Sequence, residues 1–317
     1  MTLYNLLQAS FVSIIPLLIV ALGALVSERS GVTNIALEGI MLIGAFVGIW
    51  VIRDIESSGI PLQLVFIIGI LVGGIVGGLF ALIHAYASIN MNADQIISAT
   101  ALNLFAPAFV VFTARTIQGG QQVKFDSVFR MEEVGFLSKI PIIGDIFFTN
   151  AFISTYIGIA LLVIVFIFLY RTKTGLRIRS CGENPHAADS LGINIYKIRY
   201  FSVITSGFFA GMGGVIFVAT TSNTFDATVA GFGFLSLAVL IFGNWRPFRI
   251  LGAAIFFGLM RTIASSVVAI PFLNNLDLPS EFYRMIPYIM TLIVLAFFSK
   301  NSQAPKAVGQ PYDQGKR

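Results

Sequence analysis

The chain has 317 residues, of which 56% are hydrophobic and only 11% are charged. Soluble domains carry about 25% charged residues, so this composition excludes an ordinary soluble domain and predicts an integral membrane protein. The net charge of +5 then reflects orientation signals in the loops rather than binding to nucleic acid. The single cysteine, Cys181, excludes an intrachain disulfide and a cysteine-based metal cluster.

Apolar runs long enough to cross a bilayer as helices recur along the chain. They predict an all-α, polytopic transmembrane helical bundle of about nine spans, in a single domain covering 1–317. In chain order the predicted spans are 11–26, 35–52, 62–87, 96–112, 149–170, 199–220, 230–243, 250–270 and 284–299. The seventh span is short, which indicates a tilted or partly re-entrant segment.

The basic residues predict how this bundle is oriented. Loop 171–198 holds the densest group of Lys and Arg, which is typical of the cytoplasmic side. With that loop inside, 113–148 becomes an extracytoplasmic loop with room for a small structured element, and 300–317 becomes a cytoplasmic tail. The N-terminus is therefore expected outside and the C-terminus inside.

A compact helix signal lies within the basic loop. Asn184 can cap a helix through its side-chain oxygen, and Pro185 falls at the first helical position, where its missing N–H costs nothing. Gly192 can end this helix in the left-handed conformation. Two interpretations remain open: an ordinary helical turn in a cytoplasmic loop, or a part that contacts something outside the bilayer.

Polar side chains inside the predicted spans need partners or water. Glu38 is either a clamp on a neighbouring backbone or Arg, or a polar element of a translocation pathway. The tight helix entry around Asn34, a plausible N-cap, favours the clamp. Thr100, Asn103 and Pro107 share one helix face, which predicts either a wet cavity or a hydrogen bond from Asn103 to a neighbouring helix.

Other residues give weaker indications. Phe225, Phe232 and Phe234 can stack on a planar ligand, but core packing is the simpler explanation in a chain with 30 Phe. Arg261 needs a partner that the sequence does not identify, and His84 is expected to be a satisfied interior histidine. The sequence contains no GxxxxGK[ST], HExxH, CxxC or GxSxG motif, so no catalytic residue and no metal site is predicted.

Several segments resemble the permease subunits of bacterial ABC importers, in the subgroup that serves ribose, branched-chain amino acids and nucleosides. They are GVTNIALEGIMLIGAF, NADQIISATALNLFA, RSCGENPHAADSLGI and GFGFLSLAVLIFGNWRPF, and the similarity covers nearly the whole chain. The most specific motif is G-x-N-x-x-A-A-x-x-x-G-I in the basic loop. The tail 304–317 is similar to that of nucleoside-type permeases, which work with a lipoprotein of the basic membrane protein class.

The resemblance implies roles for particular residues. It implies that Glu183–Ile193 is a coupling helix, which docks into an ATPase subunit and transmits its closure to the membrane cavity. The residues assigned to coupling are Gly182, Glu183, Asn184, Pro185, Ala187, Ala188, Gly192 and Ile193. The residues assigned to the substrate pathway are Glu38, Thr100, Asn103, Phe232 and Phe234.

The resemblance also implies partners and a location. These are an ABC ATPase subunit, a second and different permease in a heterodimer, and an extracytoplasmic substrate-binding lipoprotein, in the bacterial cytoplasmic membrane. ATP is expected to be used by the ATPase, while this chain binds no cofactor and is no enzyme. A nucleoside is the expected substrate; a simple sugar or a branched-chain amino acid is the alternative. An ATPase-independent secondary transporter and a membrane scaffold are the rival classes.

Overall fold

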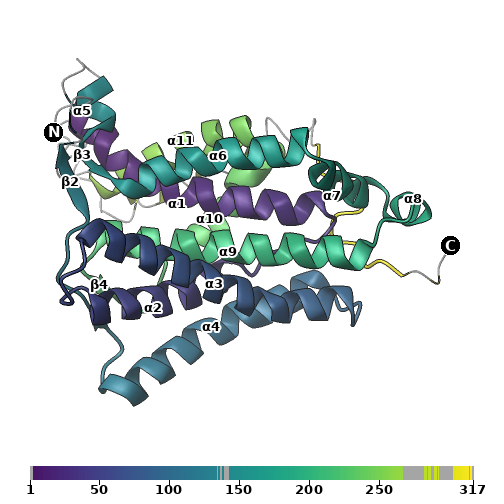
Figure 1. Cartoon of the computed structure of the whole chain (residues 1–317), viewed down its shortest axis with the longest axis horizontal. Coiled ribbons are helices and arrows are strands. Elements are labelled where there is room, and N and C mark those ends of the chain that lie inside the picture. The colour runs from purple at the N-terminus through teal and green to yellow at the C-terminus, as the bar shows by residue number, and fades with distance from the viewer. Residues whose placement is uncertain are drawn as a thin grey trace.

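A computed structural model describes residues 3–133, 135, 138, 143–266, 282–283, 285–286, 289–290, 292, 303–313 and 315. Figure 1 shows long helices lying side by side along one direction, with short strands at one end and the small helices α7 and α8 at the other. The long helices are α1 (Leu3–Arg29), α2 (Leu37–Ile55), α3 (Leu62–Ile89), α4 (Gln95–Gln118), α6 (Ile153–Arg171), α9 (Ile195–Thr221) and α11 (Pro247–Ser265).

The predicted spans coincide with helices as far as the structure describes the chain. Six of the described helices are long and apolar enough to cross a membrane: α1, α3, α4, α6, α9 and α11. Helix α2 carries charges near both ends, and α10 (Phe232–Phe242) is about 16 Å long, too short for a hydrocarbon core of about 30 Å. The ninth predicted span, 284–299, lies largely outside the described residues, so the count of nine stays a prediction.

Small elements cover the two ends of the bundle. The predicted loop 113–148 contains β1 (Val123–Lys124), β2 (Arg130–Glu133) and α5 (Ile143–Phe147), and its first residues instead extend α4. Strand β1 pairs antiparallel with β4 (Thr224–Phe225), and β2 pairs antiparallel with β3 (Thr149–Phe152). At the opposite end the basic loop folds into α7 (Lys173–Glu183) and α8 (Pro185–Ser190).

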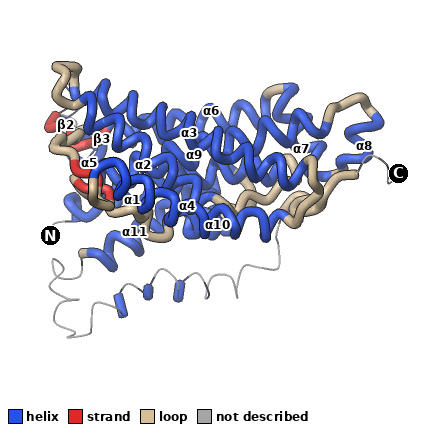
Figure 2. The backbone as a smooth tube through the Cα atoms, turned by 90° about the horizontal axis from the view of Figure 1, so that it is seen from below, coloured by secondary structure: helices blue, strands red, loops and turns tan. Residues whose placement is uncertain are grey.

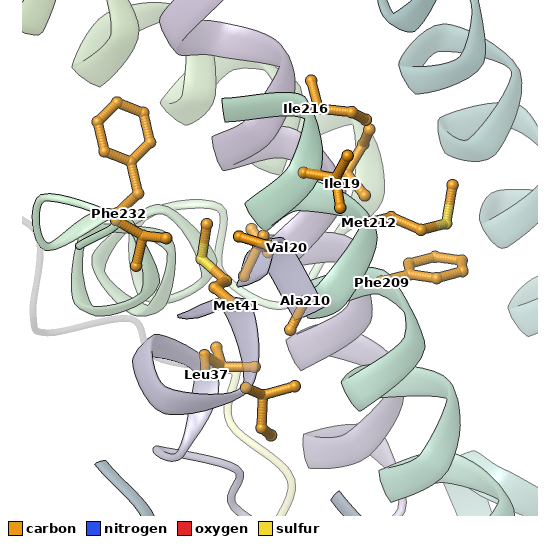
Figure 3. Packing of buried hydrophobic residues seen from close by; sticks show 14 of the residues in the cluster. Ile19, Val20, Leu37, Met41, Phe209, Ala210, Met212, Ile216 and Phe232 are labelled. Carbon is orange, nitrogen blue, oxygen red and sulfur yellow. The ribbon is translucent and has the colours of Figure 1, made fainter. Parts of the chain in front are cut away.

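The centre of the bundle is formed by α1 and α9, and α2 and α3 pack against α9. Glycines allow this close approach, as the small-residue pattern of α2, α3 and α9 indicates. A Cβ on Gly211 would lie 2.0 Å from the carbonyl oxygen of Gly73, and one on Gly214 would lie 2.1 Å from that of Met41. Figure 3 shows the resulting packing, with Val20 and Met41 gathered against α9.

The loops divide between the two ends as the predicted topology requires. Arg29 at the end of α1 donates to the carbonyl oxygen of Trp245, and Ala307 in the tail donates to that of Gly182, so these loops share one end. At the other end Arg53 of α2 bonds Gln118 of α4. Figure 2 shows the same separation, with α7, α8 and the C-terminus opposite β2, β3 and the N-terminus.

Candidate functional site

The capped helix predicted in the basic loop is present as α8. The side-chain oxygen of Asn184 accepts from the amide of Ala187 at 3.0 Å, and Pro185 occupies the first turn. Gly192 has φ +79°, and its amide donates to the carbonyl oxygen of Asp189 at 2.8 Å. Helix α8 is therefore shorter than the predicted coupling segment Glu183–Ile193, whose first residue, Glu183, is the last residue of α7.

The predicted coupling residues divide into an exposed and a buried set. Gly182, Pro185 and Ala188 face inward, and a Cβ on Gly182 would lie 2.3 Å from the carbonyl oxygen of Arg29. Ala188 was assigned to coupling, but it is 3% exposed and packs within this chain. The members left open to a partner are Glu183, Asn184, Ala187 and Gly192, with Ile193 partly exposed.

Leu191 is a candidate contact that the sequence analysis missed. Its side chain is 82% exposed at the end of α8, the highest exposure of any large apolar side chain among the described residues. No local signal in the sequence distinguishes this exposed leucine from a buried one, because its exposure depends on tertiary packing. Together with Ala187 it forms the apolar part of the exposed surface of α8.

The C-terminal tail runs beneath α7 and α8 and holds them to the bundle. Besides the bond from Ala307 to Gly182, the Gly309 amide donates to the carbonyl oxygen of Gly31 at 3.1 Å. Tyr312 is 4% exposed, and its ring lies 5.1 Å from that of His186 on α8. The sequence predicts a cytoplasmic tail here but none of these contacts, because none of them is local in sequence.

Cys181 belongs to the same small core. It packs with Ala188, Ile195 and Tyr312 and is fully buried. Burial raises the pKa of the Cys181 thiol from 9.0 to about 11, which keeps it protonated and unreactive. The thiol is free.

Glu38 is a clamp on a neighbouring backbone. Its two carboxylate oxygens accept from the amides of Gly231 at 2.9 Å and Gly233 at 2.7 Å. These amides belong to the first turn of α10, whose free N–H groups and positive dipole end favour a carboxylate. The side chain remains half-buried, so the clamp leaves part of it facing outward.

The chain that leads into α10 is irregular and contorted. Ala227 and Ala230 have φ of +55° and +52°, a conformation that costs free energy for residues with a Cβ. Arg261 finds here the partner that the sequence did not identify, since it donates to the carbonyl oxygen of Ala230 at 3.3 Å. Irregular backbone at membrane depth occurs only where protein buries it or a cavity solvates it.

The two phenylalanines assigned to the pathway have different environments. Phe232 is 2% exposed, with its ring centre 4.2 Å from that of Phe217 and the Arg261 guanidinium 5.4 Å away. This is the core-packing alternative. Phe234 is 51% exposed and remains available to a ligand, a partner or lipid.

On α4 the structure separates the three residues of the predicted polar face. Asn103 bonds α2 and the segment that leads into it, accepting from the Gly39 amide at 2.8 Å and donating to the Ile35 carbonyl oxygen at 2.9 Å. Thr100 is exposed and bonds its own helix through the carbonyl oxygen of Ile96. Pro107 lines an open hollow of about 630 Å³ further along α4, so the three do not form one cavity.

Three other polar predictions have clear outcomes. His84 is a satisfied interior histidine, with ring nitrogens 2.9 Å from the Thr33 carbonyl oxygen and 3.1 Å from the Ser98 hydroxyl. Asn34 is not the N-cap of α2, because the helix starts after Ala36 and Asn34 instead bonds Ser206 of α9. Within the described residues, no group of three or more His, Cys, Asp or Glu side chains is placed to hold a metal ion.

Comparison with known proteins identifies the family. Residues 6–295 match the family described as branched-chain amino acid transport system / permease component. The chain belongs to this permease family. Solved structures contain no match to this permease.

Relatives of the permease span nearly its whole length. It is 40% identical to the nucleoside ABC transporter permease protein NupC of Lactococcus lactis, over 95% of this chain and 94% of that protein. It is also 40% identical to the guanosine ABC transporter permease protein NupQ of Bacillus subtilis, over 98% and 96%. A second Lactococcus lactis protein, the nucleoside ABC transporter permease protein NupB, is 25% identical over 92% and 79%.

Proposed function

We propose that the chain is the transmembrane permease subunit of an ATP-driven importer of nucleosides, located in the bacterial cytoplasmic membrane. The observation that carries this proposal is the 40% identity, over nearly the full length, to permeases named for nucleoside and guanosine transport. A permease component is a transport subunit and not an enzyme, so the chemistry of ATP hydrolysis belongs to a partner. The chain itself is expected to bind no cofactor.

Coupling to the ATPase is assigned to the exposed part of Glu183–Ile193. Leu191 and Ala187 supply apolar contact area at the tip, and Glu183 and Asn184 flank them with polar groups. The inward set, Gly182, Pro185 and Ala188, holds α8 rigidly on α7 and the tail. A rigid attachment is what a lever requires, because a flexible one would absorb the movement of the ATPase.

The translocation pathway is proposed to run along the face where α2, α4 and α10 meet. Glu38 and Asn103 act there as clamps that fix α10 and α4 on α2, while Thr100 and Phe234 remain exposed to a solute. Phe232 contributes indirectly, by supporting the start of α10. One chain supplies half of such a pathway, and a second permease is proposed to supply the other half.

A heterodimer is the proposed form of that pair. Lactococcus lactis has two relatives named as nucleoside permeases, and this chain resembles one of them far more than the other. Affinity purification through a tag on this chain, followed by mass spectrometry, tests the pairing. A second permease sequence in stoichiometric amount is the expected result, and recovery of this permease sequence alone would show a homodimer.

The end that carries β1 to β4 is proposed to face outward and to receive the substrate-binding lipoprotein. The opposite end would then face the ATPase, which agrees with its high content of Arg and Lys. This places the N-terminus outside and the C-terminus inside.

The test is uptake by proteoliposomes that contain the complete importer, its lipoprotein and internal ATP. We expect guanosine, other nucleosides, or both to accumulate only when ATP is present. Uptake of a branched-chain amino acid or a sugar, with no nucleoside uptake, would leave the family unchanged but replace the nucleoside as the proposed substrate. Uptake that needs an ion gradient and no ATPase would replace the proposal by a secondary transporter, and no uptake of any solute would leave a scaffold.

A further inference from the structure

A cavity of about 460 Å³ opens beside the end of α6 and the start of α11, at the same end of the bundle as α7 and α8. Its charged lining is Arg29 of α1, Arg179 of α7, and Arg246 and Arg249 at the start of α11. No Asp or Glu of the described residues lines it. It belongs neither to the exposed surface of α8 nor to the face where α2, α4 and α10 meet.

The positive charge of this cavity is only partly compensated within the chain. Two described carboxylates interact with Arg29: Glu183, whose Oε1 is 4.0 Å from Nη1 of Arg29 at the limit of an ion pair, and the buried Glu28, which is hydrogen-bonded to Trp245. Arg29 is 11% exposed, and its Nε and that of Arg179 are buried without a hydrogen-bond partner among the described residues. Buried donors of this kind are normally satisfied, and an anion in the cavity has the matching charge and acceptors.

The cavity continues into an apolar strip on two helices that are candidate membrane spans. Phe166 of α6 and Phe248 of α11 meet in its wall, with ring centres 4.9 Å apart. One turn and two turns further into the bundle, α6 exposes Val163 and Ile159. On α11 the same direction passes Gly252, where an added Cβ would meet nothing within 4 Å, and then exposed Ile255.

An arginine-lined cavity at the end of the spans, joined to an apolar strip along them, has the chemistry of an amphiphile with an anionic head. A soluble anion would fill the cavity but make no contact with the apolar strip. An acidic protein segment would have to follow it into the hydrocarbon region, where polar backbone is excluded.

We propose that this cavity binds the phosphate headgroup of an anionic phospholipid, with an acyl chain lying along the strip between α6 and α11. Arg246 and Arg249 are exposed and attract the headgroup, and Arg29 and Arg179 contact its phosphate from deeper in the cavity. The bound lipid then links the end of α1, the start of α11 and α7, which leads directly into α8. The site depends on membrane insertion only, so it is independent of the substrate proposed above.

The test compares two double variants of the complete importer in nanodiscs of phosphatidylglycerol or phosphatidylcholine. Arg246→Gln with Arg249→Gln removes two exposed cations of the cavity, whereas Lys173→Gln with Arg177→Gln removes two exposed cations of α7 outside it. Native mass spectrometry counts the phosphatidylglycerol molecules that stay bound, and a titration of the detergent-purified importer gives their affinity. We expect the first pair to weaken binding about 30-fold, about five-fold for each charge, and the second pair to change it less than two-fold.

Four outcomes would overturn the proposal. In the first, both double variants retain the same amount of phosphatidylglycerol; in the second, the unmodified importer retains phosphatidylcholine as well as phosphatidylglycerol. In the third, millimolar glycerol phosphate or inorganic phosphate displaces the lipid; in the fourth, the Arg246 and Arg249 double variant loses the ATPase and keeps the lipid. The last would make the cavity a protein contact, and the displacement result would make it a site for a free phosphate.

Arg249→Lys, which keeps the charge, should retain the lipid, and an unchanged melting temperature of each variant excludes misfolding. Because none of these readouts uses transport, they stay informative if nucleoside uptake is not found.

Discussion

At the residue scale, Glu38 illustrates how a charge is accommodated in an apolar bundle. A carboxylate there costs several kcal/mol unless donors surround it, and the first turn of α10 offers amides that have no partner in their own helix. Glu38 accepts two of them and thereby fixes the position of a helix that is too short to span the membrane alone. The clamp is thus structural, and it lies beside the proposed pathway.

Replacing Glu38 by Ala should destabilise the folded chain by about 2–4 kcal/mol, because two half-buried amides lose a charged acceptor. The measurement is thermal unfolding of the purified importer in detergent. Asp54→Ala is the matched control, since Asp54 is an exposed carboxylate on the same helix whose ion-pair partner among the described residues is its neighbour Arg53. Equal melting temperatures for the two variants would show that the clamp contributes nothing.

Other polar residues show which roles were predictable. The capping by Asn184 follows from local sequence, and the structure has this cap. Asn103 had two possible roles, and only the position of α2 decides that it bonds Gly39 and Ile35. Asn34 looked like a helix cap for the same reason as Asn184, but α2 begins only after Ala36. The Asn34 side-chain oxygen accepts from the Ala36 amide, and its NH2 group donates to Ser206 of α9.

At the element scale, the tail and α8 form one unit. Tyr312 fills the space between α8 and α9 and covers Cys181, the only cysteine of the chain. The accessibility of the Cys181 thiol therefore shows whether Tyr312 of the tail is packed against it. Burial raises the pKa of the Cys181 thiol from 9.0 to about 11. The contribution of the protonated thiol to folding stability is therefore fully present below pH 9.0 and is lost as the pH rises toward 11.

Tyr312→Ala should increase the rate of maleimide labelling of Cys181 at least ten-fold at about pH 8, since it opens the small core and lets the thiolate form. Labelling is followed by mass spectrometry on the intact importer. Asp313→Ala, next to it but exposed, is the control and should label as slowly as the unmodified chain. Fast labelling of the unmodified chain would mean that the tail does not cover the thiol.

Helix α8 carries the second prediction at this scale. Leu191→Asp and Ala187→Trp should abolish ATP-driven uptake without lowering the melting temperature, because both side chains are exposed and only a docked partner would feel the change. Leu176→Asp makes the same substitution at an exposed leucine of α7 and should leave uptake within about two-fold. Normal uptake by the Leu191 and Ala187 variants would remove α8 from coupling.

The contact of α3 with α9 gives the third prediction at this scale. Gly211→Ala places a methyl group against the Gly73 backbone, which cannot move away, and should cost about 3 kcal/mol or more. Gly252→Ala puts the same methyl group into open space on α11 and should be neutral or stabilising by about 1 kcal/mol. The yield of folded protein and its melting temperature measure both, and tolerance of Ala at 211 would mean that the helices lie further apart.

At the scale of the whole molecule, the bundle has two unlike ends. One holds short antiparallel ribbons, and the other holds α7, α8, the tail and most of the described cations. Such an asymmetry orients a membrane protein with its cationic end in the cytoplasm.

A cysteine scan in intact cells tests this orientation. With Cys181 replaced by Ser, Gly120→Cys should react with a membrane-impermeant maleimide from outside, because position 120 is exposed at the end of α4. Lys306→Cys lies in the tail and should react only after the membrane is permeabilised. The reverse pattern would invert the bundle and exclude α8 from contact with a cytoplasmic ATPase.

Composition and local spacing are enough to predict the class of this protein, its long helices and the capped helix α8. Each of these depends on composition or on neighbours within a few residues, which a single chain displays directly. Only the tertiary structure decided that Ala188 packs inward, that Tyr312 covers Cys181, that Glu38 holds α10 and that four arginines of distant segments line one cavity. The reason is physical: these contacts join residues far apart in the chain, and hydrophobicity and spacing do not specify which faces of two helices will meet.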